Sequence, residues 1–521
     1  MAIAWIVLIF PLALMVAGAI RLRETIMPAT PPQWAERAAL VGFGLAAYAA
    51  LHVIMFGPTT SPVLGLGQIG FEVLLDAVSV ILLLLTAILA WVILRFSATY
   101  LQGEEREGHF TFWLCVTLAG IVLLVSAGNL VQLGLGWLAT GIGAKRLLIF
   151  YPNRPGAKRA ARKKLLFARS ADVALAAGLM LVYAAYGTIS IPDINAAARA
   201  GDIPVTALFA ALCLAAAAVL QSALLPVHGW LTDGRETPTP ALALLHSGVV
   251  SMGGFLLIRF ADMMLGAPFI MAILVIVGGL SALAGSVVML TQSATKATLA
   301  WSTVSQMGFI ILQCGLGLFP LALLHIVAHA VYKTHALLTS AGAGLVTRPA
   351  GQTGNIIHSS PYKFALGMAI SLTIYALVVL PLGLVENSPQ AVALGAILVF
   401  GIGCLVAQGL ADAAPRALVF EIARASVLFA TSYLTFQWVA QKLAAGTLPP
   451  TPQAGPLEWM LITLALVSFT AVTVLQALLP HWANHPAVRE MHVHTTNGFY
   501  LNALIDCFAS NWRTNPRSKE I

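Results

Sequence analysis

Three titratable side chains recur at a spacing of four residues in the apolar stretch LLHIVAHAVYKTHALL. His325, His329 and Lys333 stand at i, i+4 and i+8, so a helix would place them on one face, rising about 12 Å along its axis. Histidine exchanges its proton near neutral pH, and a buried lysine can release its own. The stack could therefore pass protons along the helix, although hydrogen bonds between packed helices are the alternative use.

Further ionisable residues fall inside or beside apolar stretches. His246, in PTPALALLHSGVVSMGG, could supply a neighbouring station of the same relay or serve as a hydrogen-bonded packing residue. Asp172 follows Arg169 by three residues, a spacing that permits a local ion pair, so structural and proton-loading roles both stay open. The weaker candidates are Asp76, Lys296, Glu421 and Arg424, of which the last two could pair with each other.

Two prolines interrupt apolar segments, Pro226 in QSALLPVHGWL and Pro381 in LVVLPLGL. Proline leaves a backbone carbonyl without its helical donor and bends or breaks the helix. Broken helices at membrane depth line cavities or binding sites. The breaks fall in the seventh and twelfth apolar spans, five apart. This spacing predicts two five-helix repeats, and an odd number of helices makes the copies inverted in the membrane.

These side chains need helices that cross a bilayer. The 521 residues are 59% hydrophobic and 9% charged, against about 25% charged in a soluble domain. Long Leu- and Ala-rich runs of about 20 residues match the hydrocarbon thickness and favour helices over a barrel. We therefore predict an all-α polytopic membrane protein with 14 or 15 spans. They lie near residues 2–19, 38–56, 73–94, 112–127, 130–147, 168–186, 205–224, 239–258, 267–290, 298–316, 320–344, 363–384, 390–408, 417–439 and 457–479.

The basic residues predict the orientation. If the side reached after the first span is called side A, most Lys and Arg lie there, whereas side B holds only Arg199, Arg259 and Lys442. Side A is then cytoplasmic in a bacterial inner membrane, with the N-terminus outside and the C-terminus inside. The densest basic stretch, residues 145–169, is interpreted as an anchor on anionic membrane lipids or as a dock for an acidic partner. No nucleic-acid-binding module accompanies it.

The predicted organisation has five parts. They are N-terminal helices (1–111), a first repeat (112–260), a second repeat (261–410), C-terminal helices (411–479) and a cytoplasmic tail that docks a partner (480–521). The five cysteines form no metal-binding spacing. No nucleophile–base pair or phosphate loop is visible either, so we expect neither a metal, a cofactor nor enzymatic activity in this chain.

Several of these motifs resemble the proton-conducting, antiporter-like subunits of respiratory complex I (NuoL) and of Mrp cation/proton antiporters. The resemblance is closest over residues 70–345. It implies inverted five-helix repeats, broken helices seven and twelve, and a chain of buried ionisable groups. His246, His325, His329 and Lys333 match relay positions of that family, and Lys296 and Asp172 match other family positions. The matching stretches are LGW (135–137), ARSADV (168–173), QSALLPVHGWLTDGRETPTPALALLHSG (221–248), TKATLAWSTVSQMGF (295–309) and LLHIVAHAVYKTHALL (323–338).

The sequence also departs from this family. A glutamate is usual after the Gly-Trp of span five, where this chain has Leu138, and a lysine is usual in span seven, where it has Gln221. The lysine motif usual in span twelve is missing, and only Glu386 follows Pro381. These departures argue against a redox-driven pump.

The C-terminal stretch HPAVREMHVHTTNGFYLNALIDCF is similar to DabB, the membrane subunit of a two-component inorganic-carbon accumulation complex. The resemblance implies a soluble cytoplasmic partner, DabA-like, that carries zinc and resembles a β-carbonic anhydrase. A flow of protons or Na⁺ would then drive one-way hydration of CO₂ to bicarbonate. The alternatives are a subunit of a Mrp-type antiporter or complex I-like pump, and a passive membrane anchor. The predicted partner-docking residues are His492, His494, Asn497, Phe499 and Tyr500.

Overall fold

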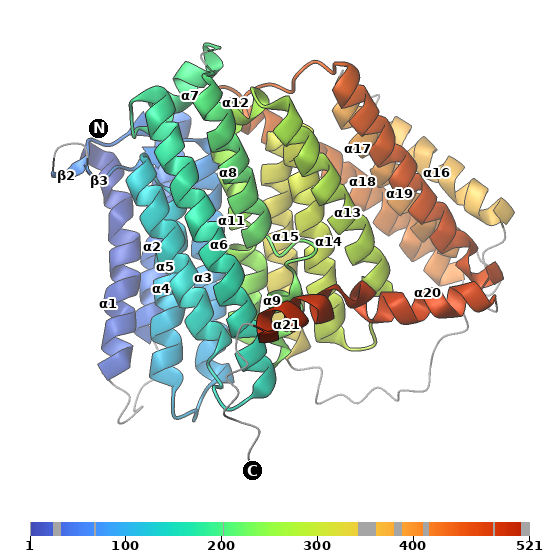
Figure 1. The fold of residues 1–521 in the computed structure, drawn as a ribbon, viewed down its shortest axis with the longest axis horizontal. Coiled ribbons are helices and arrows are strands. Elements are labelled where there is room, and N and C mark those ends of the chain that lie inside the picture. The colour runs from blue at the N-terminus through green and yellow to red at the C-terminus, as the bar shows by residue number, and fades with distance from the viewer. Residues whose placement is uncertain are drawn as a thin grey trace.

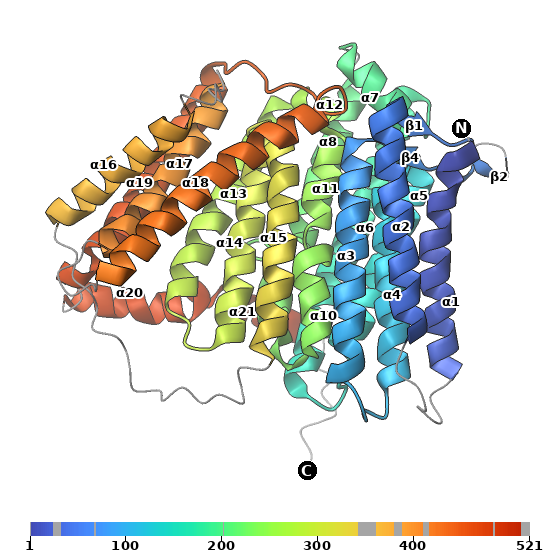
Figure 2. The same cartoon turned by 180° about the vertical axis from the view of Figure 1, so that it is seen from behind.

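Long helices running between two opposite faces make up the molecule (Figures 1 and 2). The computed structural model describes residues 2–23, 33–66, 69–201, 203–341, 361–379, 388–409, 416–482 and 485–511. One face carries the short helices α7 (Ile191–Arg199) and α12 (Ala261–Leu265) and corresponds to side B. The other carries α20 (Pro486–Thr496) and α21 (Leu501–Asn511) and corresponds to side A.

The spanning helices follow the predicted order. The first half of the chain contains η1 (Ala2–Leu8), α1 (Ile9–Arg23), α2 (Gln33–Phe56), α3 (Ala77–Tyr100), α4 (Glu107–Val125), α5 (Leu130–Leu148), α6 (Pro155–Tyr186), α8 (Val205–Gln221), α9 (Gly229–Thr232), η2 (Gly234–Glu236), α10 (Thr239–Leu244), the π-helical η3 (Leu245–Val249) and α11 (Met252–Arg259). The second half contains α13 (Pro268–Leu290), α14 (Thr295–Gly315), α15 (Phe319–Ser340), α16 (Pro361–Val379), α17 (Pro389–Gly409), α18 (Arg416–Ala444), α19 (Pro456–Trp482) and η5 (Gly498–Tyr500).

The all-α membrane fold predicted from the sequence is confirmed. Each of the fifteen predicted spans overlaps a helix or a helical group such as α10–η3–α11. Within the described ranges, nine helices are long and apolar enough to cross a membrane. Helices α16–α19 form a tilted group at the end far from α1, and α18 reaches back to contact α15 and α3 (Figure 2).

Short strands occur only in the side B connection between α2 and α3, as far as the structure describes the chain. They are β1 (Thr59–Thr60), β2 (Leu64–Leu66), β3 (Ile69–Phe71) and β4 (Leu74–Leu75). Strand β1 pairs with β4 and β2 with β3, both antiparallel. Strand β4 leads directly into α3, and these short strands leave the all-helical class unchanged.

The helix break predicted at Pro226 is confirmed. Helix α8 ends at Gln221, and α9 begins only at Gly229. The second predicted break, at Pro381, lies outside the described residues, as does Glu386. The inverted repeats and the five predicted chain divisions therefore stay predictions.

The predicted start of span six is wrong. Helix α6 begins at Pro155 rather than near residue 168, with proline in its first turn, where no helical N–H is needed. The anchor interpretation of the basic stretch fails for Lys163 and Lys164, which are 3% and 1% exposed. Lys158 lies in the same helix and is exposed. Part of the predicted surface patch therefore lies inside the protein.

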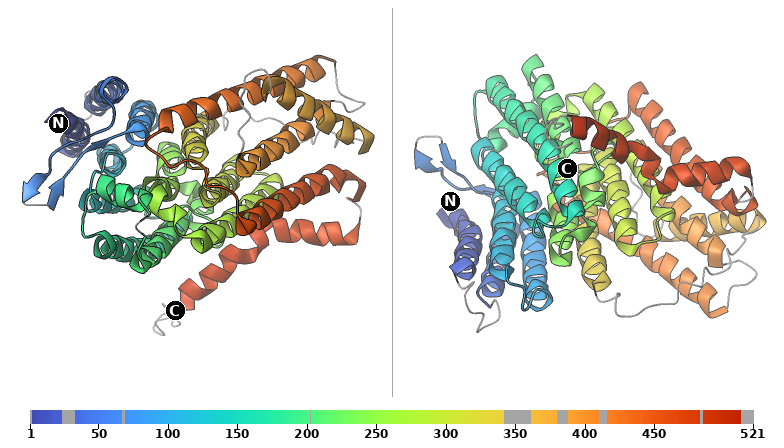
Figure 3. Two further views of the ribbon diagram at one scale, coloured as in Figure 1. Left: turned by 90° about the horizontal axis from the view of Figure 1, so that it is seen from above. Right: turned by 60° about the horizontal axis from the view of Figure 1, so that its bottom comes forward.

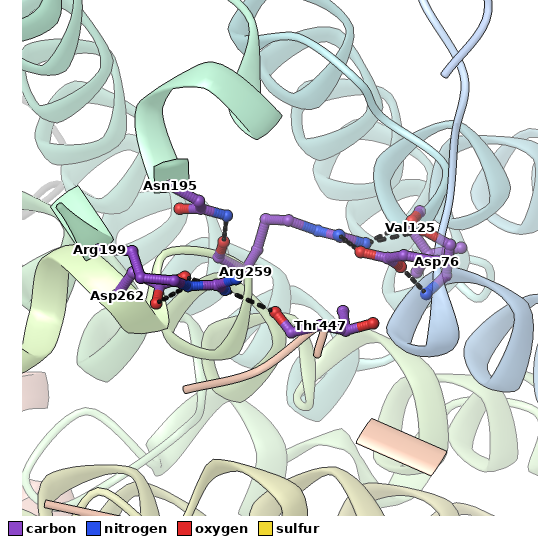
Figure 4. Close-up of polar contacts among 8 residues, drawn as sticks. Asp76, Val125, Asn195, Arg199, Arg259, Asp262 and Thr447 are labelled. Carbon is purple, nitrogen blue, oxygen red and sulfur yellow. Dashed lines mark hydrogen bonds and ion pairs between the residues drawn. The ribbon is translucent and has the colours of Figure 1, made fainter. Parts of the chain in front are cut away.

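Ion pairs join the elements of side B (Figure 4). Asp76 accepts the backbone N–H of Ser79 at 2.7 Å and so caps α3. It also accepts a hydrogen bond of 2.6 Å from Arg259, which is 3% exposed at the end of α11. Asp76 is therefore a cap and an ion-pair partner. Arg259 belongs to a helix rather than to a loop of side B.

A second ion pair lies beside the first. Arg199 of α7 holds Asp262 of α12 with two hydrogen bonds, of 3.0 and 2.9 Å, and the bond to Asp262 raises the pKa of Arg199. Arg199 also donates to the carbonyls of Gly446 and Thr447 (Figure 4). The connection after α18 is thereby tied to the first half of the chain.

The tail does not hang free of the helices. Helices α20 and α21 lie across the side A face and cross the spanning helices rather than run along them (Figures 1 and 3). Lys163 of α6 binds Asp233 at 2.6 Å and Asp506 of α21 at 2.9 Å. Asn502 of α21 donates to Asp233 at 3.0 Å. This group of four side chains, the tail junction, fastens α21 to the start of α6.

Candidate functional site

The predicted histidine and lysine stack lies along α15, which runs from side B to side A. Lys333 is 0% exposed and donates from Nζ to the backbone carbonyl of Leu299 at 3.0 Å. His329 is 4% exposed, and neither of its ring nitrogens has a hydrogen-bond partner among the described residues. Buried polar groups without partners are rare in structural roles. The helix face predicted from the sequence is therefore buried at His329 and Lys333.

His325 is held differently, near side B. Its Nδ1 lies 3.0 Å from Oε1 of Gln313 and its Nε2 lies 2.6 Å from Oε1 of Gln306. Both glutamines belong to α14, so His325 joins α15 to α14. It is partly rather than fully buried.

Helix α14 connects Lys333 to His246. Nδ1 of His246 lies 2.9 Å from the hydroxyl of Thr303, and this hydroxyl donates to the carbonyl of Leu299 at 3.0 Å. The Thr303 hydroxyl has one hydrogen and donates it in the bond to the Leu299 carbonyl. Its oxygen therefore accepts from His246, whose Nδ1 carries a hydrogen in this arrangement. The same carbonyl accepts from Lys333. One hydroxyl and one carbonyl thus link two titratable groups on different helices.

His246 sits in the π-helical turn η3, a local geometry that occurs frequently at functional sites. The carbonyl of Val249, in the same turn, accepts from Nε2 of Gln221 at 3.3 Å. Gln221 is the last residue of α8 before the break and is 2% exposed. The break therefore brings an amide side chain against the segment that carries His246.

The amide of Gln221 also receives a lysine. Nζ of Lys164 donates to its Oε1 at 2.9 Å and lies 4.1 Å from the centroid of the Trp230 ring. One series of contacts thus runs from Lys164 through Gln221 to η3, and from His246 through Thr303 and the Leu299 carbonyl to Lys333. The series spans α6, α8, η3, α14 and α15.

The remaining predicted site residues make no hydrogen bond to this series, although Asp172 interacts electrostatically with Lys164. Asp172 pairs with Arg169 at 2.9 Å and accepts from the Trp137 indole at 3.1 Å, so the local ion pair is present. Lys296 is half-buried in the first turn of α14, with no hydrogen bond or ion pair among the described residues. Leu138 is 38% exposed on the surface of α5.

The lesser pair, Glu421 and Arg424, is joined at 2.9 Å, with both side chains largely exposed. This matches the sequence-based suggestion that the two residues pair with each other. Their exposure gives them no contact with the buried series.

The five predicted docking residues gather at the junction of α20 and η5. His494 packs edge-on against Tyr500, with ring centroids 5.6 Å apart, and Asn497 donates to the Tyr500 hydroxyl at 3.3 Å. Phe499 and Tyr500 have positive φ angles of 54° and 57°, which turn the chain sharply between the helices. His492, Phe499 and Tyr500 are exposed. Their docking role stays a prediction.

Sequence reasoning missed Lys164 and Thr303 and treated Gln221 only as a departure. Lys164 is one of five basic residues between positions 158 and 164, and nothing in that stretch distinguishes it from a surface charge. The available signal was Pro155, whose position suits the first turn of a helix that would carry Lys164 inward. Thr303 lies in the motif STVSQ, but no sequence pattern shows which side chain it contacts.

Comparison with known proteins identifies the class. The family model described as "NADH:quinone oxidoreductase/Mrp antiporter, TM" matches residues 127–408, the part of the chain that holds the whole buried series. The chain belongs to this family, whose members are membrane subunits of the transporter type. A solved structure of the Mrp complex from Dietzia sp. DQ12-45-1b has the same fold, with a TM-score of 0.66 and 19% identity over 99% of this chain and 60% of the Mrp chain.

Within the family the chain is DabB-like. It is 33% identical over 497 residues to the "Probable inorganic carbon transporter subunit DabB2" of Halothiobacillus neapolitanus, covering 92% of this chain and 87% of the relative. It is 41% identical over 264 residues to the "Probable inorganic carbon transporter subunit DabB" of Hydrogenovibrio crunogenus, covering 50% of this chain and 51% of the relative. The resemblance stated from the sequence motifs is confirmed.

Proposed function

We propose that this chain is the proton-conducting membrane subunit of an energy-coupled inorganic-carbon uptake complex. Protons, or Na⁺ ions in their place, enter from side B, pass His325, His329, Lys333 and His246, and leave at side A. The observation that carries the proposal is the burial of His246, His329 and Lys333 in one part of the bundle. Lys333 and Thr303 both donate to the Leu299 carbonyl, and Thr303 contacts His246; this carbonyl positions the two titratable groups and does not itself carry a proton. Ionisable groups inside a membrane bundle are expensive, and an anchor has no use for them.

The coupling partner is expected on side A. By analogy with the DabB-like relatives, we assign it as a soluble, DabA-like zinc protein that converts CO₂ to bicarbonate, while this chain carries no cofactor. Exposed residues of the α20–η5 junction, His492 and Tyr500 among them, offer it a surface. The excess of Lys and Arg on side A supports a cytoplasmic side A in a bacterial plasma membrane.

A variant series tests conduction. In cells that depend on this chain for bicarbonate accumulation, Lys333→Ala and His329→Ala should reduce accumulation at least about tenfold, because each removes a proton-carrying group. His335→Ala is the matched control, since His335 lies on the same helix and is exposed. An uncoupler should abolish accumulation in the unsubstituted protein. Full accumulation in both variants, or in the presence of uncoupler, would support a passive anchor instead.

The identity of the assembly needs a separate measurement. Mild-detergent purification of the tagged chain, followed by mass spectrometry and zinc analysis, should recover a large soluble zinc protein in stoichiometric amount. Recovery of several other hydrophobic subunits without zinc would place the chain in a Mrp- or complex I-type assembly.

A further inference from the structure

Lys164 is a buried ammonium group without a carboxylate in contact. It is 1% exposed, its hydrogen bond goes to the neutral amide of Gln221, and its other close neighbour is the Trp230 ring. Removing an ammonium group from water costs several kcal/mol, and one neutral hydrogen bond and a ring face return only part of this. If Lys164 had only a structural role, an apolar side chain at this buried position would stabilise the fold more than the lysine does.

No carboxylate binds the Lys164 ammonium group directly, although the charge of Asp172 acts on it at longer range. Asp172, two turns along α6, is paired with Arg169 and bound by Trp137. Asp233, which follows α9, pairs with Lys163. Helix α8, which packs along α6, contains no Asp, Glu, Lys, Arg or His. The contacts of the Lys164 ammonium are therefore neutral.

Gln221 suits a lysine that changes its protonation state. Its Oε1 accepts from the ammonium form. Rotation of the amide would give up the hydrogen bond to the Val249 carbonyl and let the NH₂ donate to the lone pair of the neutral amine. A carboxylate would stabilise the charged form and hold the proton. Gln221 also contacts the Val249 carbonyl in η3, so Lys164 stands at one end of the series that reaches Lys333 at the other.

We propose that Lys164 is a second proton-carrying residue of the conducting path, positioned at the break between α8 and α9. The ammonium form releases H⁺ to water toward side A and leaves a neutral amine, which takes up the next H⁺ arriving from the direction of η3. This inference rests on the proposed function, and it adds α6 to the helices that conduct.

The test is proton flux into liposomes that contain the full-length chain with its co-purifying subunits, driven by a membrane potential and read by a trapped pH dye. Lys164→Arg keeps the charge and the donors, but guanidinium does not release its proton. Flux should therefore fall at least about tenfold in Lys164→Arg and in Lys164→Gln. Lys158→Gln, which changes an exposed lysine of the same helix, should keep wild-type flux.

An exchange variant separates the chemical role from the structural one. Lys164→Gln combined with Gln221→Lys returns one amine and one amide to the break on opposite helices, and recovery of flux supports the proposal. Wild-type flux in a correctly assembled Lys164→Arg variant would overturn it and leave the proposed function intact. Absence of flux in the unsubstituted protein would overturn the proposed function and this inference together.

Discussion

At the scale of single residues, the connection between His246 and Lys333 depends on Thr303. Its single hydroxyl contacts His246 and donates to the carbonyl that also binds Lys333. Thr303→Val keeps the shape but removes the hydroxyl, and the Nδ1–H of His246 loses its acceptor. We expect a destabilisation of about 1–3 kcal/mol and a marked loss of proton flux. Thr303→Ser restores the hydroxyl and should restore both.

Flux and thermal unfolding of the two variants, measured on the same preparations, check this prediction. A purely structural role would be indicated if Thr303→Val lost stability and retained the flux per folded molecule. Thr303 would then hold α14 against α10–η3–α11 without taking part in conduction.

At the scale of elements, the ion pair between Asp76 and Arg259 fastens the start of α3 to the end of α11. Arg259→Leu leaves the buried carboxylate of Asp76 without its cation, and we expect a loss of about 3–5 kcal/mol in unfolding free energy. Asp76→Asn combined with Arg259→Leu should recover much of this, because no unpaired charge remains.

The matched control is Arg424→Leu, which breaks an exposed arginine–carboxylate pair, that with Glu421. Exposed pairs contribute about 0–1 kcal/mol, so its thermal unfolding should be nearly unchanged. Equal effects of Arg259→Leu and Arg424→Leu in thermal unfolding in detergent would contradict the prediction.

Elements are also where sequence reasoning succeeded and failed. The fifteen spans and the break at Pro226 could be predicted, because hydrophobic run length and proline act locally along the chain. The start of α6 could not be placed by charge, since Lys163 and Lys164 look identical to Lys158 in sequence. Their burial depends on Gln221 and Asp233, which are 57 and 70 residues away. Likewise, the face of His329 and Lys333 followed from periodicity, whereas the bridge through Thr303 depends on packing between helices.

At the scale of the whole molecule, the tail is fastened to the membrane helices by the tail junction. Asn502→Ala combined with Asp506→Ala removes three contacts of α21, two with Lys163 and one with Asp233. We expect α21 to detach more often, because few buried contacts would then hold it. Limited proteolysis should cut the tail faster than in the unsubstituted protein.

Glu490→Gln is the control for the tail experiment, since Glu490 is an exposed residue of α20 outside the junction. Unchanged cleavage in the double variant would mean that other contacts, such as Gly498 against the Trp301 ring, hold the tail by themselves.

The two consecutive lysines of α6 have a mechanical consequence. Neighbouring side chains on a helix project about 100° apart, so Lys163 faces the tail while Lys164 faces the break. A rotation of α6 about its axis that released Asp506 would also turn Lys164 away from Gln221. Attachment of the tail and the geometry of the helix break therefore both depend on the rotation of α6. A force that turned α21 on the side A surface would change the contact between Lys164 and Gln221 inside the bundle.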